Sequence, residues 1–178
     1  MIIALDSYYK DNVCNTSLVL FLNQDSSEPI YTDTIYTDVT SEYIPGEFYK
    51  RELPGIIQIL EKLQKEHPEY WNGVNIIITD SFIKLKDSEH EWDGLGMHLE
   101  KYLIEKGQVK TIFGVAKTRF AECNLISEMV CRGESNTPLY VQSTTNPKIA
   151  AEFVKNMHGN YRIPTMLKLV DSLSRVFN

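Results

Sequence analysis

The sequence predicts a mixed α/β fold, with a central sheet that has helices on its faces. Three short β-rich segments come first, segments of helical and strand character then alternate, and two amphipathic segments close the chain. Strands that follow one another directly favour antiparallel pairing, whereas strands separated by a helix favour parallel pairing. We therefore predict an antiparallel meander that continues into parallel strands.

The first strand is predicted at residues 1–6 (MIIALD), a short apolar run that ends on a carboxylate. Residues 16–22 (TSLVLFL) form a second β-rich run. Residues 30–39 alternate and are rich in Thr, Tyr and Ile, which is typical of a half-buried third strand. The turn residues NQDSSEP between the second and third runs indicate a hairpin.

The next segments alternate between helix and strand. Residues 53–66 predict a helix with Pro54 in its first turn. Residues 74–80 (VNIIITD) predict a buried parallel strand that again ends on a carboxylate, and residues 93–106 predict a helix closed by Gly107. The apolar face of the first of these helices comprises Ile56, Ile57, Leu60 and Leu63.

The remaining segments complete the predicted sheet and add two helices. Strands are expected at 111–116, 126–132 and 138–143, and helices at 146–157 and 165–176. The two helical stripes comprise Ile149, Ala150, Phe153, Val154 and Met157, and then Met166, Leu169, Val170, Leu173 and Val176.

Length and composition suit one domain spanning residues 1–178, because 43% of the 178 residues are hydrophobic and 24% are charged. The chain has no apolar run of about 18 residues, so we expect no transmembrane helix. Its N-terminus lacks the basic and apolar regions of a secretory signal, so we expect a cytoplasmic protein. We also expect a monomer.

Cysteine content and net charge narrow the function classes. Cys14, Cys123 and Cys131 share no metal-ligand spacing, so we expect three reduced thiols and no zinc site. The net charge of -6 is unusual for a protein that binds nucleic acid, since Lys and Arg supply most of that affinity. A carboxylate cluster that holds divalent ions would reverse the local charge, and a basic groove could coexist with an acidic remainder.

Two apolar strands end on an aspartate, Asp6 and Asp80. Ligand sites of α/β sheets gather at the carboxyl ends of strands, so neighbouring aspartates there could share a divalent cation. The same residues also suit turns and helix caps, and the pattern alone leaves both interpretations open. Glu52 alone indicates a first-turn helix residue and Asp171 a solvated one, so periodicity does not single them out.

Six segments, taken in order, resemble the endonuclease V family. YIPGEFYKRELP (43–54) is similar to the family's PYIPG loop and the F-R-E-x-P element that follows it. The other five cover most of the remaining chain and are IIITDSF (76–82), GLGMHL (94–99), FGVAKT (113–118), PLYVQS (138–143) and YRIPTMLKLVD (161–171).

This resemblance implies a ribonuclease H-like mixed central sheet flanked by helices. It also implies a Mg²⁺- or Mn²⁺-dependent endonuclease that hydrolyses a phosphodiester near deaminated adenine (inosine) in DNA or RNA, by water attack that leaves a 3′-hydroxyl. The implied metal ligands are Asp6, Glu52, Asp80 and Asp171. Lys117 matches a lysine that can neutralise charge beside the scissile phosphate.

The resemblance also implies residues that contact the substrate. Tyr43 matches an aromatic wedge that fills the gap when the damaged base leaves the stack. Gly46 and Gly114 match positions where backbone lines the base pocket. The full set implied to bind substrate is Tyr43, Ile44, Pro45, Gly46, Arg51, Ser81 and Gly114.

Some positions depart from the family pattern. The family's Asp-Gly pair is Asp80-Ser81 here, so a side chain enters a region where glycine permits close approach. The family's next histidine has two candidate counterparts, Lys86 and His90, and Thr144, Thr145 and Asn146 replace a Gly-His-Arg piece. His98 is expected to pack rather than bind metal.

These departures keep two further hypotheses open. One is a nuclease with a different substrate, such as a mismatch or another modified base, and Ser81 motivates it. The other is a non-catalytic module that binds nucleic acid or protein, and the acidic net charge motivates it.

Overall fold

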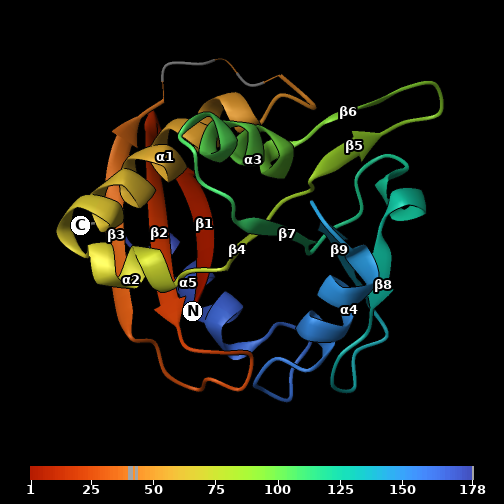
Figure 1. Cartoon of the computed structure of the whole chain (residues 1–178). Coiled ribbons are helices and arrows are strands. Elements are labelled where there is room, and N and C mark those ends of the chain that lie inside the picture. Colours follow the sequence, from red (N-terminus) through yellow and green to blue (C-terminus); the bar gives the residue numbers. More distant parts are fainter. Residues whose placement is uncertain (40–41, 43, 178) are drawn as a thin grey trace.

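A seven-stranded mixed sheet forms the centre of the molecule (Figure 1). The computed structural model describes residues 1–39, 42 and 44–177. The strands of this sheet are β1 (Ile2–Lys10), β2 (Val13–Phe21), β3 (Tyr31–Asp38), β4 (Ile76–Thr79), β7 (Thr111–Ala116), β8 (Glu128–Val130) and β9 (Leu139–Ser143). The helices are α1 (Tyr49–Glu66), α2 (Pro68–Gly73), α3 (Leu95–Glu105), α4 (Pro147–Lys155) and α5 (Thr165–Ser174). A separate hairpin joins β5 (Lys84–Lys86) to β6 (Glu91–Asp93), and a 3₁₀ turn spans Cys123–Ile126.

The strand order in the sheet is β3-β2-β1-β4-β7-β9-β8. β1, β2 and β3 form an antiparallel meander, and β4 and β7 then continue the sheet parallel to β1. β9 and β8 complete it in antiparallel pairing. The predicted ribonuclease H-like mixed sheet flanked by helices is therefore confirmed.

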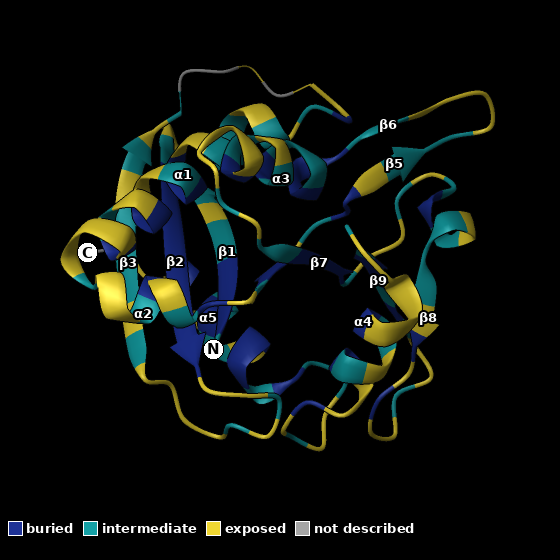
Figure 2. Cartoon of the chain, viewed as in Figure 1, coloured by how far each residue is buried: buried dark blue, intermediate teal, exposed yellow. Residues whose placement is uncertain are grey.

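Two apolar cores lie on the two faces of the sheet. α1, α2 and α3 pack on one face against Ile3 and Leu5, whereas α4 and α5 pack on the other against Ile2 and Ala4. This division follows from the alternation of side chains along β1. The middle strands are buried, whereas the outward faces of the helices are exposed (Figure 2).

α1 begins at Tyr49, four residues earlier than predicted, and Pro54 therefore lies inside the helix rather than in its first turn. Proline leaves one backbone hydrogen bond unmade in a helix, but burial of the apolar face compensates for this loss. Gly55 lets α1 approach β2 closely, because a Cβ there would lie 2.5 Å from Thr16 Oγ1. The close packing fixes the first turn of α1, which carries Glu52, against the sheet.

The predicted stripes of the last two helices need three corrections. Ile149 is 64% exposed, because Ala150 and Val154 form the buried stripe of α4 and Ile149 lies about 100° from Ala150. Met157 is buried as predicted, but it lies beyond α4, which ends at Lys155. α5 ends at Ser174, so Val176 lies beyond the helix and is 51% exposed. The carbonyl of Val176 instead accepts hydrogen bonds from Asn15 and Tyr36.

Gly107 ends α3 as predicted, in the left-handed conformation with φ +71°. The amides of Gly107 and Gln108 donate to the carbonyls of Ile104 and Leu103, the paired bonds that close a helix of this type. Cys14, Cys123 and Cys131 are free thiols, as expected. Across the described residues, no helix has both the length and the apolar character needed to cross a bilayer.

Candidate active site

The pairing of β1 with β4 places two aspartates side by side. Leu5 pairs with Thr79 in parallel register, so the next residue of each strand, Asp6 and Asp80, lies where β4 ends. Asp6 follows Ala4 in the alternation along β1, which directs its side chain toward α5. α5 contributes Asp171, and one carboxylate oxygen from each of Asp6, Asp80 and Asp171 lies within 4.8 Å of the others.

Two cations neutralise part of this carboxylate group. Lys117, which follows β7, places its Nζ atom 2.6 Å from Asp80 Oδ2 and 2.6 Å from Asp171 Oδ1. Arg175 pairs with both oxygens of Asp171, at 3.0 Å from Nε and 3.1 Å from Nη2. The structure thus brings together Asp6, Asp80, Asp171 and Lys117, residues that are distant in sequence.

Ser174 and Arg175 belong to this group but were not predicted from the sequence. Ser174 is fully buried, and its Oγ atom donates a hydrogen bond to Asp6 Oδ2 at 2.6 Å. The two residues lie three and four positions after Asp171, on the same side of α5. That helical spacing was the available signal, but it points to a site only once Asp171 is placed there.

Glu52 reaches the group from the opposite helical layer. Its first-turn position on α1 puts it on the lining of a cavity of about 200 Å³, together with Asp6, Asp80 and Asp171. This is possible because β4 ends at Thr79 while β1 continues to Lys10, which opens the sheet at that point. Carboxylates from both faces therefore meet in one place.

The pKa values reflect an excess of buried negative charge. Burial and the nearby Asp80 carboxylate raise the pKa of Asp6 to about 6. Burial, together with the charges of Asp6 and Asp80, raises the pKa of Glu52 to about 8. The hydrogen bond from Arg175 lowers the pKa of Asp171 to about 2.

The same residues fit a divalent cation. Their oxygens are the hard ligands that Mg²⁺ and Mn²⁺ prefer, and a cation would stabilise the charged carboxylates that burial disfavours. Asp6, Asp80 and Asp171 could hold the ion directly, with Glu52 on the lining of the same cavity.

Glu52→Gln is expected to stabilise the metal-free protein at pH 8. The pKa of Glu52 is about 8 in the folded state, against 4.5 ordinarily, so the folded state binds the extra proton and stability falls as pH rises between these values. Glutamine removes this loss. Since one pKa unit corresponds to about 1.4 kcal/mol, we expect at least that gain in the free energy of unfolding.

Urea unfolding in the presence of a chelator measures this effect, at pH 5 and at pH 8. The difference between Glu52→Gln and the unaltered protein should shrink at pH 5. Glu28→Gln, at an exposed loop position, is the matched control. A Glu52→Gln variant that is less stable at pH 8 would show that Glu52 is not held under charge repulsion.

A larger cavity of about 430 Å³ adjoins the carboxylates. Glu52, Asp80, Lys117 and Arg175 stand on its inner side. Its remaining lining is largely apolar and aromatic, and includes Phe48, Tyr49, Phe82, Leu85, Leu95 and Phe120. Ser81 also lines it, but its Oγ atom lies 2.8 Å from Thr79 Oγ1, so the hydroxyl bonds to the end of β4.

Of the other residues predicted to contact substrate in this loop, one lines the cavity and two are exposed. Tyr43 lies outside the described residues. Ile44 and Pro45 are exposed, and Gly46 lines the cavity with φ +83° and accepts a hydrogen bond from Trp92 Nε1 at 3.4 Å. This contact with Trp92 is how the β5–β6 hairpin supports the loop.

Arg51 and Gly114 are not among the residues that line this cavity. The Arg51 guanidinium lies over the ring of Tyr9, 4.5 Å from its centroid, where its charge offsets part of the rise in the pKa of Glu52 that burial, Asp6 and Asp80 cause. Gly114 lies behind the cavity lining, and a Cβ there would come within 2.5 Å of the Ser81 carbonyl. Its lack of a side chain lets the backbone at Ser81 lie close against β7.

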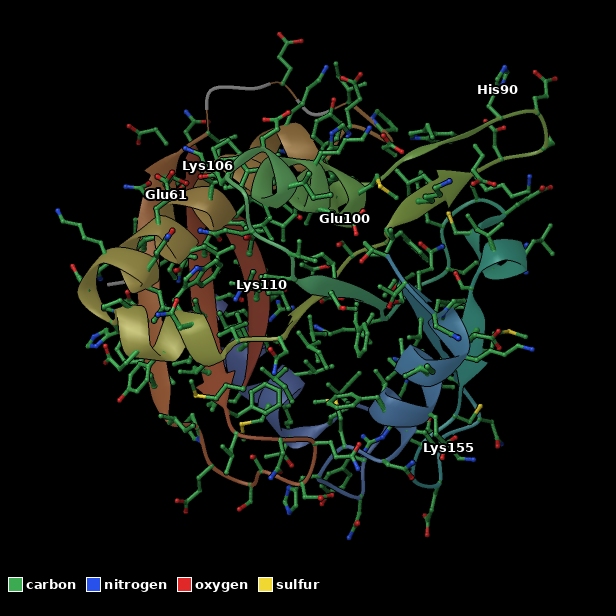
Figure 3. The ribbon with its side chains drawn as sticks, in the orientation of Figure 1. Glu61, His90, Glu100, Lys106, Lys110 and Lys155 are labelled. Atoms are coloured by element: carbon green, nitrogen blue, oxygen red, sulfur yellow. The ribbon has the colours of Figure 1, made fainter. Side chains whose placement is uncertain are left out.

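The candidate histidine counterparts do not join the carboxylate group in the described part of the chain. His90 stands in the exposed loop of the β5–β6 hairpin (Figure 3), and Lys86 lies in β5. His98 stacks on Tyr49 with ring centroids 3.6 Å apart, which agrees with the packing expected for it. The side chain of Asn146 caps α4.

These features define a class of protein: a ribonuclease H-like fold in which the middle of β1, the end of β4 and the last helix bring carboxylates together. The particular likeness is to endonuclease V. The family model for endonuclease V matches residues 1–81, which include Asp6, Glu52 and Asp80. None of the curated proteins matches the chain by sequence.

Solved structures extend the likeness to the whole chain. The catalytic domain of human endonuclease V has a TM-score of 0.75 at 18% identity, over 98% of this chain and 80% of that chain. Endonuclease V of Ciona intestinalis, in complex with an inosine-containing DNA, has a TM-score of 0.75 at 16% identity, over 98% and 83%. Endonuclease V of Bacillus subtilis has a TM-score of 0.65 at 15% identity, over 97% and 78%. The resemblance to endonuclease V is confirmed, and the chain has its fold.

Proposed function

We propose that the chain is a metal-dependent endonuclease that hydrolyses a phosphodiester near inosine in DNA or RNA. The observation that carries the proposal is the carboxylate group of Asp6, Asp80 and Asp171. Lys117 pairs with two of these carboxylates, and the group adjoins a cavity of about 430 Å³. A bound Mg²⁺ or Mn²⁺ would lower the pKa of an attacking water and neutralise charge on the phosphate.

The residues of the chain support this chemistry in distinct ways. Asp6, Glu52, Asp80 and Asp171 would hold the ion. Lys117 lies between Asp80 and Asp171, from where its ammonium can neutralise charge that develops on the phosphate. Ser174 fixes one oxygen of Asp6, which leaves the other for an ion.

Inosine is proposed as the target base on two grounds. Residues 1–81 match the endonuclease V family, and the Ciona protein is described in complex with DNA that contains inosine. The aromatic and apolar lining of the larger cavity suits a base that has left the stack. Ser81 also lines this cavity in place of the family's glycine, and this replacement motivates the second candidate, a nuclease that accepts another base.

A cleavage assay tests the proposal. Labelled DNA and RNA strands that differ only by one inosine are incubated with Mg²⁺ or Mn²⁺, and the same strands are given to a Ser81→Gly variant. We expect metal-dependent cleavage one bond beyond inosine, with a preference that Ser81→Gly leaves within a few fold, because the Ser81 hydroxyl is bonded to Thr79.

Each contrary outcome would favour a different hypothesis. Metal-dependent cleavage without inosine preference would support the changed substrate. An inosine preference that appears only in Ser81→Gly would assign the change to Ser81. Absence of cleavage on every strand would contradict the nuclease and favour a non-catalytic binding module.

A further inference from the structure

A second cleft, of about 1110 Å³, shares Lys117 and Arg175 with the cavity of about 430 Å³. Its walls come from the loop between β8 and β9, the segment between α4 and α5, and α5 itself. Lys117, Asp171 and Arg175 belong both to this cleft and to the carboxylate site. A strand that places a phosphate at the carboxylates would therefore continue into the cleft.

The cleft is basic although the chain is acidic. Its lining carries four cationic side chains and two acidic ones, in a chain of net charge -6. The cations are Lys117, Arg162, Lys168 and Arg175, and the acids are Glu134 and Asp171. Clustered Lys and Arg are what contacts with phosphates require.

Tyr161 presents an aromatic ring at this cleft. The residue is 73% exposed, although a large aromatic side chain is normally at least half buried. Lys168 Nζ lies 5.5 Å from the ring centroid, so a cation and an aromatic face are presented together. Aromatic faces beside cations are the arrangement on which unpaired nucleic-acid bases stack.

The backbone beneath Tyr161 is held by a buried arginine. Arg132 is 5% exposed and donates to the carbonyls of Tyr161 at 2.8 Å and Gly159 at 2.9 Å, and also to that of Met157. Gly133, at φ +59°, allows the backbone at Asn160 to approach closely, because a Cβ at position 133 would lie 2.3 Å from the Asn160 carbonyl oxygen.

Arg162 also fixes the segment that carries the Tyr161 ring. It donates to the carbonyls of Thr137 and Pro138, and to that of Lys117. The exposed ring of Tyr161 thus stands on a backbone that is fixed before binding, which lowers the entropy lost when a ligand binds. The same contact connects this segment to the lysine of the carboxylate site.

We propose that this cleft binds an unpaired strand of nucleic acid that leads away from the bond to be cleaved, with one base stacked on Tyr161 and one phosphate paired with Lys168. The assignment rests on the proposed nuclease function and deepens it, because it gives the strand a path beyond the carboxylates. Selectivity for the target base belongs to the other cavity, and stacking here is indifferent to sequence.

Fluorescence anisotropy with a labelled single-stranded oligonucleotide, in a chelator that prevents metal-dependent cleavage, tests the cleft. Stacking contributes about 1–3 kcal/mol per base, so Tyr161→Ala is expected to weaken binding about tenfold. Tyr161→Phe keeps the ring and should bind within twofold of the unaltered protein. Lys168→Ala should weaken binding several-fold and lower the slope of log K against log salt by about 0.7.

Lys65→Ala is the matched control, because Lys65 is an exposed lysine on α1, across the sheet from α5. It should leave both the affinity and the salt slope unchanged. The high exposure of Tyr161 means that its variants should keep the melting temperature of the unaltered protein.

The outcomes separate this inference from the proposed function. A protein that binds and cleaves, with Tyr161→Ala and Lys168→Ala both within twofold, would overturn the cleft assignment and leave the nuclease intact. A protein that binds without cleaving, and is weakened by Tyr161→Ala, would support the cleft and overturn the nuclease. Absence of binding to any strand would overturn the cleft assignment, and only the absence of cleavage as well would overturn the nuclease.

Discussion

Asp80→Asn is expected to reduce metal-dependent cleavage by at least about 1,000-fold while the protein remains folded. Asp80 contributes to the carboxylate group with Asp6 and Asp171 and pairs with Lys117 at 2.6 Å. Asparagine has nearly the same shape but no charge, so one of the gathered anionic ligands is lost while packing is preserved.

The fold should tolerate this change, since burial raises the pKa of Asp80 and the charged form is disfavoured without an ion. Metal titration followed by thermal melting should show a smaller metal-induced rise in melting temperature for Asp80→Asn than for the unaltered protein. Asp25→Asn, at an exposed turn, is the matched control. Cleavage by Asp80→Asn at the unaltered rate would remove the carboxylate group from the mechanism.

The apolar runs made much of the sheet predictable. Residues 2–5 and 77–79 are buried, so the apolar runs at 1–6 and 74–80 predicted buried strands, the second of them parallel. The adjacency of Asp6 and Asp80 follows from that pairing, because Leu5 pairs with Thr79 in parallel register. The prediction that the first strand ends on Asp6 was wrong, since β1 continues to Lys10 and only β4 ends at this point. Glu52 and Asp171 carry no such signal, and their placement needed the resemblance to a family.

Tertiary packing decided what the local pattern missed. The hairpin of β5 and β6 has three residues in each strand, too few to show a period, and it is held by contacts such as that of Trp92 with Gly46. Ser174 and Arg175 read as ordinary helix residues until α5 is packed against β1. The exposed position of Ile149 likewise depends on which side of α4 meets the sheet.

Lys117→Ala is expected to separate catalysis from metal binding. The ammonium of Lys117 lies 2.6 Å from Asp80 and 2.6 Å from Asp171, oxygens that a metal ion would also use. Burial lowers the pKa of Lys117, but the carboxylates of Asp80 and Asp171 outweigh it, so the net shift is upward and the side chain is charged at neutral pH. Its positive charge therefore opposes a divalent cation in the same place.

Removing that charge should tighten binding of Mn²⁺ by about tenfold, and the same variant should cleave about 100- to 1,000-fold more slowly. Mn²⁺ affinity is read from the electron paramagnetic resonance of the free ion, and cleavage from labelled strands at saturating metal. Lys117→Arg keeps the charge and should retain more activity without the gain in affinity. A Lys117→Ala variant that lost Mn²⁺ affinity together with activity would mean that Lys117 holds the carboxylates in place, because only a lysine that competes with the metal makes the two measurements move in opposite directions.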